Sequence, residues 1–280
     1  MLPETQAFQE RQRLRATANG ADNVGNVFLK EGKVALKKHW VLLIYLVLLM
    51  AGFNFMSHGS QDLYPTMLKS QLEFSATQIT VTQVVANLGA MAGGATVGYL
   101  SQSVGRRISI IVMCFIGGAL LYPYTFVRTE AVMAAAFFQQ FCVQGAWGVI
   151  PIHLMELSPG SIRTFVVGLS YQLGNLASSA SSTIEARLGE RFPLPASAEG
   201  EKRYDYGKVI AIFMGCVYVY VIILTFVGPE HLRRKFDVVH DQDARAVVGD
   251  ERMDYEQARR MEEDDRKLSD VEKPSNKHIA

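Results

Sequence analysis

The sequence predicts an all-α membrane protein with six transmembrane helices, arranged as a three-plus-three inverted repeat. Six stretches are mostly apolar over about 20 residues, which a helix needs to cross the ~30 Å hydrocarbon core of a bilayer. Charged residues are densest in residues 1–38 and after Gly228, and they are sparse in the long apolar runs between these segments. Polar residues recur at helical spacing in only some of the six stretches. The averages, 49% hydrophobic and 20% charged over 280 residues, hide this division.

The predicted spans form one transmembrane domain over residues 39–228. They cover about 40–66 (more polar toward its end), 78–100, 108–127, 131–152, 164–184 and 209–227. Residues 1–38 are expected to be the remnant of a cytoplasmic central loop. Residues 229–280 mix acidic and basic side chains and are expected to be a largely disordered cytoplasmic tail, with one helical stretch near Asp254–Lys267. Basic residues next to the spans favour placing both termini in the cytoplasm.

Polar residues distinguish four spans from the other two. In the first span, the spacing places five residues on one helical face: Asn54, His58, Gln61, Asp62 and Pro65. The second, fourth and fifth spans carry Gln78, Thr82, Gln83 and Asn87, then Gln140 and Gln144, then Gln172, Asn175, Ser179 and Ser182. The third and sixth are almost wholly apolar and are expected to face lipid. This pattern divides the spans into two similar triplets, although hydrogen bonds between helices could explain the same polar faces.

Several classes of protein are disfavoured. The net charge of +1, without a basic stripe, argues against a nucleic-acid-binding protein. Three cysteines in three different apolar stretches suggest no disulfide framework. The sequence has no phosphate-binding loop, no channel filter motif and no nucleophile turn of an intramembrane protease. His153 and Glu156 could bind a metal, but two ligands do not make a site. We therefore expect no enzyme, no metal and no cofactor.

Two loop motifs resemble those of the major facilitator superfamily. The run from Gly98 to Arg107 resembles its G-x-x-x-D-x-x-G-R-R loop, with Gln102 in place of the usual aspartate. The run Glu156-Leu-Ser-Pro-Gly-Ser-Ile-Arg163 resembles its second cytoplasmic motif, in which a carboxylate and a guanidinium can pair across helix ends. The resemblance implies conformational-switch loops made by Gly98, Gly105, Arg106, Arg107, Glu156 and Arg163.

The stretch from Asn54 to Thr66 resembles the N-x-x-[S/T]-H-x-[S/T]-Q-D-x-x-x-T signature of the fungal lactate/pyruvate:proton symporters, which are close to the sialate:proton symporters in the same superfamily. Residues 163–179 resemble their eleventh helix. The resemblance implies that the chain is the carboxy-terminal six-helix half of a twelve-helix protein. Its expected partners are the amino-terminal six-helix half and the membrane lipid. It also implies plasma-membrane import of short-chain monocarboxylates (lactate, pyruvate, acetate class) with a proton. The implied substrate-binding residues are Asn54, Ser57, His58, Ser60, Gln61, Thr66, Gln172 and Asn175.

His58 and Asp62 are the predicted proton-coupling pair. Ionisable side chains are rare inside membrane spans and usually functional there. A histidine titrates near physiological pH, and a carboxylate one helical turn away can hold its proton. We expect the pair to take a proton from outside and to couple it to an anionic substrate. The alternatives are that the pair only holds two helices together, that the substrate is another organic anion or a sugar, or that the chain is an inactive truncated fragment.

Overall fold

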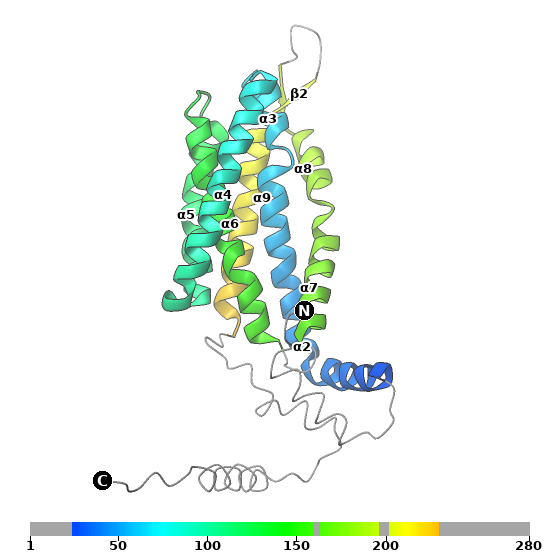
Figure 1. Cartoon of the computed structure of the whole chain (residues 1–280). Coiled ribbons are helices and arrows are strands. Elements are labelled where there is room, and N and C mark those ends of the chain that lie inside the picture. Colours follow the sequence, from blue (N-terminus) through cyan, green and yellow to red (C-terminus); the bar gives the residue numbers. More distant parts are fainter. Residues whose placement is uncertain (1–23, 159–162, 196–201, 230–280) are drawn as a thin grey trace, which may run out of the picture. The chain divides into compact units, whose positions relative to one another are not determined.

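The computed structural model describes residues 24–158, 163–195 and 202–229, and the described chain is mostly helical (Figure 1). The expectations for residues 1–23 and for residues 230–280, including the helical stretch near Asp254–Lys267, lie outside the described residues. The helices are α2 (Val24–Gln61), α3 (Tyr64–Gln71), α4 (Ala76–Val104), α5 (Arg106–Phe126), α6 (Val132–Leu157), α7 (Arg163–Ser178), α8 (Ser181–Gly189) and α9 (Tyr206–Val227). Two short strands, β1 (Pro193–Leu194) and β2 (Arg203–Tyr204), pair antiparallel before α9.

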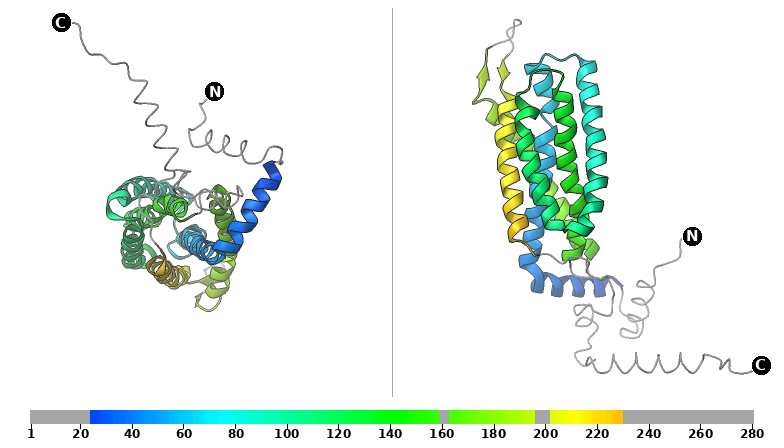
Figure 2. Two further views of the ribbon diagram at one scale, coloured as in Figure 1. Left: turned by 90° about the horizontal axis from the view of Figure 1, so that it is seen from below. Right: turned by 90° about the vertical axis from the view of Figure 1, so that its left-hand side faces the viewer.

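The helices form a bundle within the compact unit that begins at Ala35 (Figure 2). The described residues before Ala35 belong to a second unit, in which they form the first turns of α2. Inside the bundle, α4 packs along α6, and α5 packs against both α6 and α9. Successive long helices run in opposite directions, so that the ends of α2 and α5 and the start of α6 lie at one end of the bundle (Figure 1).

Each predicted span coincides with one helix or with two consecutive helices. Among the described residues, three segments are long and apolar enough to cross a membrane by length and composition, namely His39–Gln71, Arg106–Phe126 and Tyr206–Val227. Helices α4 and α6 have 29 and 26 residues, but their glutamines and glycines lower their hydropathy. Helix α7 has only 16 residues because the fifth predicted span is interrupted. That all six segments cross the bilayer stays a prediction.

The first predicted span is divided in two after Gln61. Pro65 lies in the first turn of α3 and has no backbone N–H to donate to the carbonyl of Gln61. The backbone N–H of Asp62 still donates to the His58 carbonyl at 2.9 Å, and the regular ladder ends there. The polar face from Asn54 to Pro65, expected on one continuous helix, is therefore distributed over α2, a break and α3.

The fifth predicted span is divided at Ser179 and Ala180. The hydroxyls of Ser178 and Ser179 donate to the backbone carbonyls of Asn175 and Leu176, at 3.0 and 2.7 Å. Serine side chains that bond to nearby backbone groups compete with the helical ladder, which explains why a serine-rich run interrupts the helix. The second piece, α8, continues to Gly189, five residues beyond the predicted end of the span.

Glycines bring α4 and α6 into direct backbone contact. A Cβ atom at Gly89 or Gly93 would collide with the carbonyl oxygen of Phe137 or Phe141 on α6, and one at Gly148 would collide with the Gly94 carbonyl on α4. We call this contact line the α4–α6 glycine seam. Small residues of this kind are typical of helix interfaces in membranes.

The outer faces of α5 and α9 are apolar. Phe115 on α5 and Ile223 on α9 are 64% and 55% exposed, whereas Cys114 and Tyr218 on their inner faces are buried. A large apolar surface of this kind suits contact with lipid tails. The lipid-facing role of these two helices stays a prediction.

Candidate functional site

The last residues of α2 build a buried hydrogen-bond network with α5 and α6. The Gln140 side chain on α6 donates to the Ser60 hydroxyl at 3.2 Å and accepts from the Gln61 side chain at 3.1 Å. The Tyr124 hydroxyl on α5 donates to the Ser60 backbone carbonyl at 2.6 Å. The Tyr124 ring stacks on Tyr64 of α3, with ring centroids 4.1 Å apart. The polar groups of Ser60 and Gln61 thus already have partners inside the bundle.

His58 and Asp62 lie at the end of α2, on a half-exposed surface. Nδ1 of His58 is 3.3 Å from Oδ2 of Asp62, and the two side chains are 40% and 36% exposed. This exposure is much larger than that of Ser60, which is fully buried. The pair is therefore accessible from the surface of the described structure, whereas the adjacent Ser60 is not.

The other signature residues lie in different environments. Asn54 is buried, and its side-chain amide donates to the Met50 carbonyl in the same helix at 3.0 Å. Ser57 is half-buried, and Thr66 is exposed on α3, beyond the helix break. Ser57 is thus partly accessible and Thr66 is accessible, whereas the Asn54 amide already has a hydrogen-bond partner in its own helix.

Helix α7 brings Gln172 and Asn175 next to α2. The contact is made at Gly174, where an added Cβ would lie 2.8 Å from the backbone N of Ala51. Gln172 is exposed and Asn175 is half-buried. Among the described residues, no hydrogen bond joins either side chain to His58 or Asp62.

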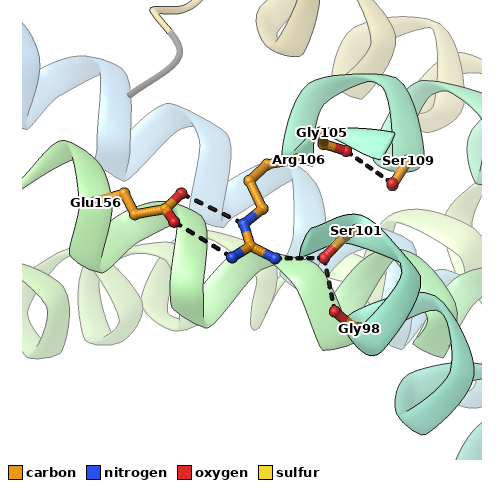
Figure 3. Close-up of polar contacts among 6 residues, drawn as sticks. All are labelled: Gly98, Ser101, Gly105, Arg106, Ser109 and Glu156. Atoms are coloured by element: carbon orange, nitrogen blue, oxygen red, sulfur yellow. Dashed lines mark hydrogen bonds and ion pairs between the residues drawn. The ribbon is translucent and has the colours of Figure 1, made fainter. Parts of the chain in front are cut away.

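The two loop motifs meet at the other end of the bundle, through Arg106. Its guanidinium donates two hydrogen bonds to the Glu156 carboxylate, both at 3.3 Å, and a third to the Ser101 hydroxyl at 2.6 Å (Figure 3). Both charged side chains are almost fully buried, with 6% and 4% exposed. Arg163, whose guanidinium the sequence analysis considered as a possible partner of Glu156, begins α7. The structure joins the carboxylate of the second motif to an arginine of the first, and a pairing of Glu156 with Arg163 stays a prediction.

Two glycines shape the first loop motif. Gly105 connects α4 to α5 with φ of 107° and ψ of 149°, which side-chain-bearing residues rarely adopt. Gly98 lies against α6, where an added Cβ would be 3.1 Å from the Gly148 carbonyl oxygen. Gln102, at the position of the usual aspartate, is exposed, so the Arg106–Glu156 pair forms without a carboxylate at that position.

Arg107 links the same loop to the end of α9. Its guanidinium donates to the backbone carbonyls of Thr225, at 2.8 Å, and Phe226. A cation at a helix C-terminus satisfies carbonyls that lack partners in the helix and interacts favourably with the helix dipole. The expectation that the arginines contact neighbouring helix ends matches this geometry, and their part in a conformational switch stays a prediction.

The sequence analysis missed Glu185, which lies on α8 and is fully buried. Neither carboxylate oxygen has a hydrogen-bond partner among the described residues. The predicted span ended at Ile184, one residue too early. The polar spacing of the fifth span, continued from Ser178 and Ser182, leads to position 185 and would have revealed it.

Comparisons with known proteins give the chain a family. A family model described as "Sugar (and other) transporter" matches residues 3–242. The "Carboxylic acid transporter protein homolog" of Saccharomyces cerevisiae is 43% identical over 247 residues, which make up 84% of this chain and 40% of that protein. "Putative polyol transporter 1" of Arabidopsis thaliana is 26% identical over 140 residues, 47% of this chain and 27% of that protein. The chain thus spans less than half the length of these relatives.

Solved structures share the fold. The xylose transporter XylE from E. coli, in its partially occluded inward-open conformation, superimposes with a TM-score of 0.53 at 16% identity, over 83% of this chain and 60% of that chain. Its inward-open conformation gives a TM-score of 0.55 at 15% identity, over 82% and 56%. The family model covers most of the sequence, and the relatives are transporters rather than enzymes. The chain therefore belongs to the sugar (and other) transporter family, a group of multi-pass membrane proteins of the major facilitator superfamily.

Proposed function

We propose that this chain serves proton-coupled import of short monocarboxylates across the plasma membrane, with both termini in the cytoplasm. The observation that carries the proposal is the half-exposed His58–Asp62 pair, 3.3 Å apart, next to the buried Ser60–Gln61–Gln140 network. The 43% identity to the yeast carboxylic acid transporter homologue supports the substrate class. Because the chain spans 40% of that protein, we propose that it acts together with an amino-terminal six-helix half.

The pair offers a simple coupling mechanism. With a proton on His58 and a charge on Asp62, the pair has no net charge. Loss of that proton leaves one negative charge, which repels an anionic substrate in a low-dielectric site. A carboxylate substrate therefore binds best when the proton is bound, and the two travel together. The exposure of both side chains supports this step, because the proton must exchange with the outer solution.

Hydrogen-bond donors near the pair would hold the substrate carboxylate. Ser57 and Gln172 are the best placed. Ser57 directly precedes His58 and is half-buried, and Gln172 is exposed on the adjacent α7. Asn54 is a weaker candidate than the signature implies, since its amide already donates to the Met50 carbonyl. Ser60 and Gln61 would position the end of α2 through Gln140, and Thr66 and Asn175 would line the same region.

The test is uptake of labelled lactate at acidic external pH, in cells that lack carboxylate transporters. One culture expresses this chain alone and another co-expresses it with the amino-terminal half of a related symporter. Uptake that needs an acidic exterior in the co-expressing culture would support the proposal. His58→Ala and Asp62→Asn should each abolish proton-dependent uptake, whereas Glu190→Gln, at an exposed residue just after α8, should leave it unchanged. Unchanged proton dependence in both site variants would refute the coupling role of the pair.

A second candidate substrate class is sugars or polyols. The family model and the 26% identity to the plant polyol transporter favour it. The same cultures should therefore be tested with labelled xylose and sorbitol. Uptake of these compounds but not of lactate would replace the monocarboxylate proposal.

A further inference from the structure

The Glu185 carboxyl is buried where its charged form is costly. The side chain is fully buried, and within the described part of the chain neither of its oxygens has a hydrogen-bond partner. Ser181, one helical turn earlier, is also buried, and its hydroxyl has no partner among the same residues. A carboxylate without hydrogen bonds or a counter-ion is unfavourable in a low-dielectric interior, whereas the neutral acid is tolerated. This setting favours a group that holds a proton.

The ionisable neighbours of Glu185 come from several helices. It is close enough to Asp62 at the α2–α3 break and to Tyr124 on α5 for an electrostatic interaction with each. Tyr64 on α3 stacks on Tyr124, and Tyr206 on α9 approaches α8 at Gly189. The cation of α8, Arg187, is exposed and pairs with Glu190. No cation is found as a hydrogen-bond or ion-pair partner of Glu185 in the described parts of the chain.

Two interrupted helices each carry one of the acidic groups. Asp62 follows the last residue of α2, and Glu185 lies on the short second piece of the α7–α8 pair. Asp62 is half-exposed, whereas Glu185 is sealed inside the bundle. Interrupted helices are typical of binding sites in transporters, because their ends expose polar groups and allow local movement. Asp62 is therefore accessible from the surface, whereas Glu185 is not.

We propose that Glu185 is a second proton-binding site, which receives its proton through Asp62 and holds it inside the bundle. The proposal deepens the function above and rests on it for its role in transport. In the first step, hydronium at the surface transfers a proton to an Asp62 oxygen and leaves water. In the second step, this O–H bond breaks as a new O–H bond forms on a Glu185 oxygen, and Asp62 is charged again. The negative charge of Asp62 further disfavours a negative charge on Glu185. Glu185 thus stores the proton while the outer pair returns to its starting state.

The direct test is infrared difference spectroscopy on the purified full chain in lipid, between acidic and alkaline pH. A buried carboxylic acid gives a carbonyl band that disappears when it loses its proton. This band should be lost in Glu185→Gln and kept in the matched control Glu190→Gln. Glu185→Asp should keep a band at a changed frequency, which separates loss of the acid from loss of the fold. An unaltered spectrum in Glu185→Gln would overturn the proposal.

Two further measurements test the coupling and the transport role. Asp62→Asn removes a negative charge beside Glu185 and should let its band disappear at a lower pH; an unchanged titration would refute the link. In the co-expression assay, Glu185→Gln should still exchange external for internal lactate but should not accumulate it in response to an acidic exterior. Normal accumulation in this variant would refute the storage role. The infrared band needs no transport, so a band without lactate uptake would refute only the proposed function.

Discussion

Replacing Glu156 with glutamine should strongly destabilise the bundle. The change removes one charge from a pair joined by two hydrogen bonds of 3.3 Å and leaves Arg106 buried, with 6% of its side chain exposed. Breaking a buried ion pair by removing one partner costs about 3–5 kcal/mol. The hydrogen bond from Arg106 to the Ser101 hydroxyl does not neutralise the charge of the guanidinium. We therefore expect a loss within this range.

The assay is equilibrium unfolding of the purified chain in detergent, followed by circular dichroism. The matched control is Glu190→Gln, since Glu190 is 57% exposed and lies 3.7 Å from an exposed Arg187, a type of pair worth about 1 kcal/mol or less. The double variant Arg106→Met with Glu156→Met should recover much of the loss, because no unpaired buried charge remains. Equal effects of Glu156→Gln and Glu190→Gln would show that the buried pair does not stabilise this fold.

Other predictions concern the seam, the network and the connecting loop. Gly93→Ala should cost about 3 kcal/mol or more because its methyl group meets backbone on α6, whereas Gly215→Ala has open space; size-exclusion chromatography and thermal unfolding compare the two. Tyr124→Phe leaves the buried Ser60 carbonyl without this donor and should lower stability by about 1–3 kcal/mol, read from the unfolding midpoint. Gly105→Ala should cost about 1–3 kcal/mol in the same measurement, because alanine is strained at φ of 107°.

The positions of the helices could be predicted because hydropathy and spacing are local properties. The apolar stretches of the sequence all correspond to helices. The separation of Gln140 and Gln144 by four positions indicated a polar face of α6. The interruption after Gln61 was readable in principle from Pro65, whose missing N–H is a property of one residue. The polar run of residues 54–66 hid that signal, because its spacing also fits a continuous helix.

Partners between helices could not be predicted in the same way. The motif suggested Arg163 as a possible partner of Glu156, but it did not indicate the contact with Arg106, which lies 50 residues earlier in the chain. Glu185 was missed because we placed the end of the fifth span where the hydropathy falls. A buried acid lowers the hydropathy of a segment as much as an exposed acid does, so hydropathy could not reveal its burial. Sequence spacing shows which face a side chain occupies, but tertiary packing decides what covers that face.

The α4–α6 glycine seam also decides which parts of the molecule can move. Two backbones in contact cannot slide past each other without collision, and the Arg106–Glu156 pair ties α5 to the same block. Bending is easiest where the backbone ladder is already interrupted, at Asp62 and at Ser179. We expect the protein to change shape by movement of a stiff block of three helices relative to two hinges. One hinge is at Asp62 and the other precedes Glu185, the two acids that we propose to carry the proton.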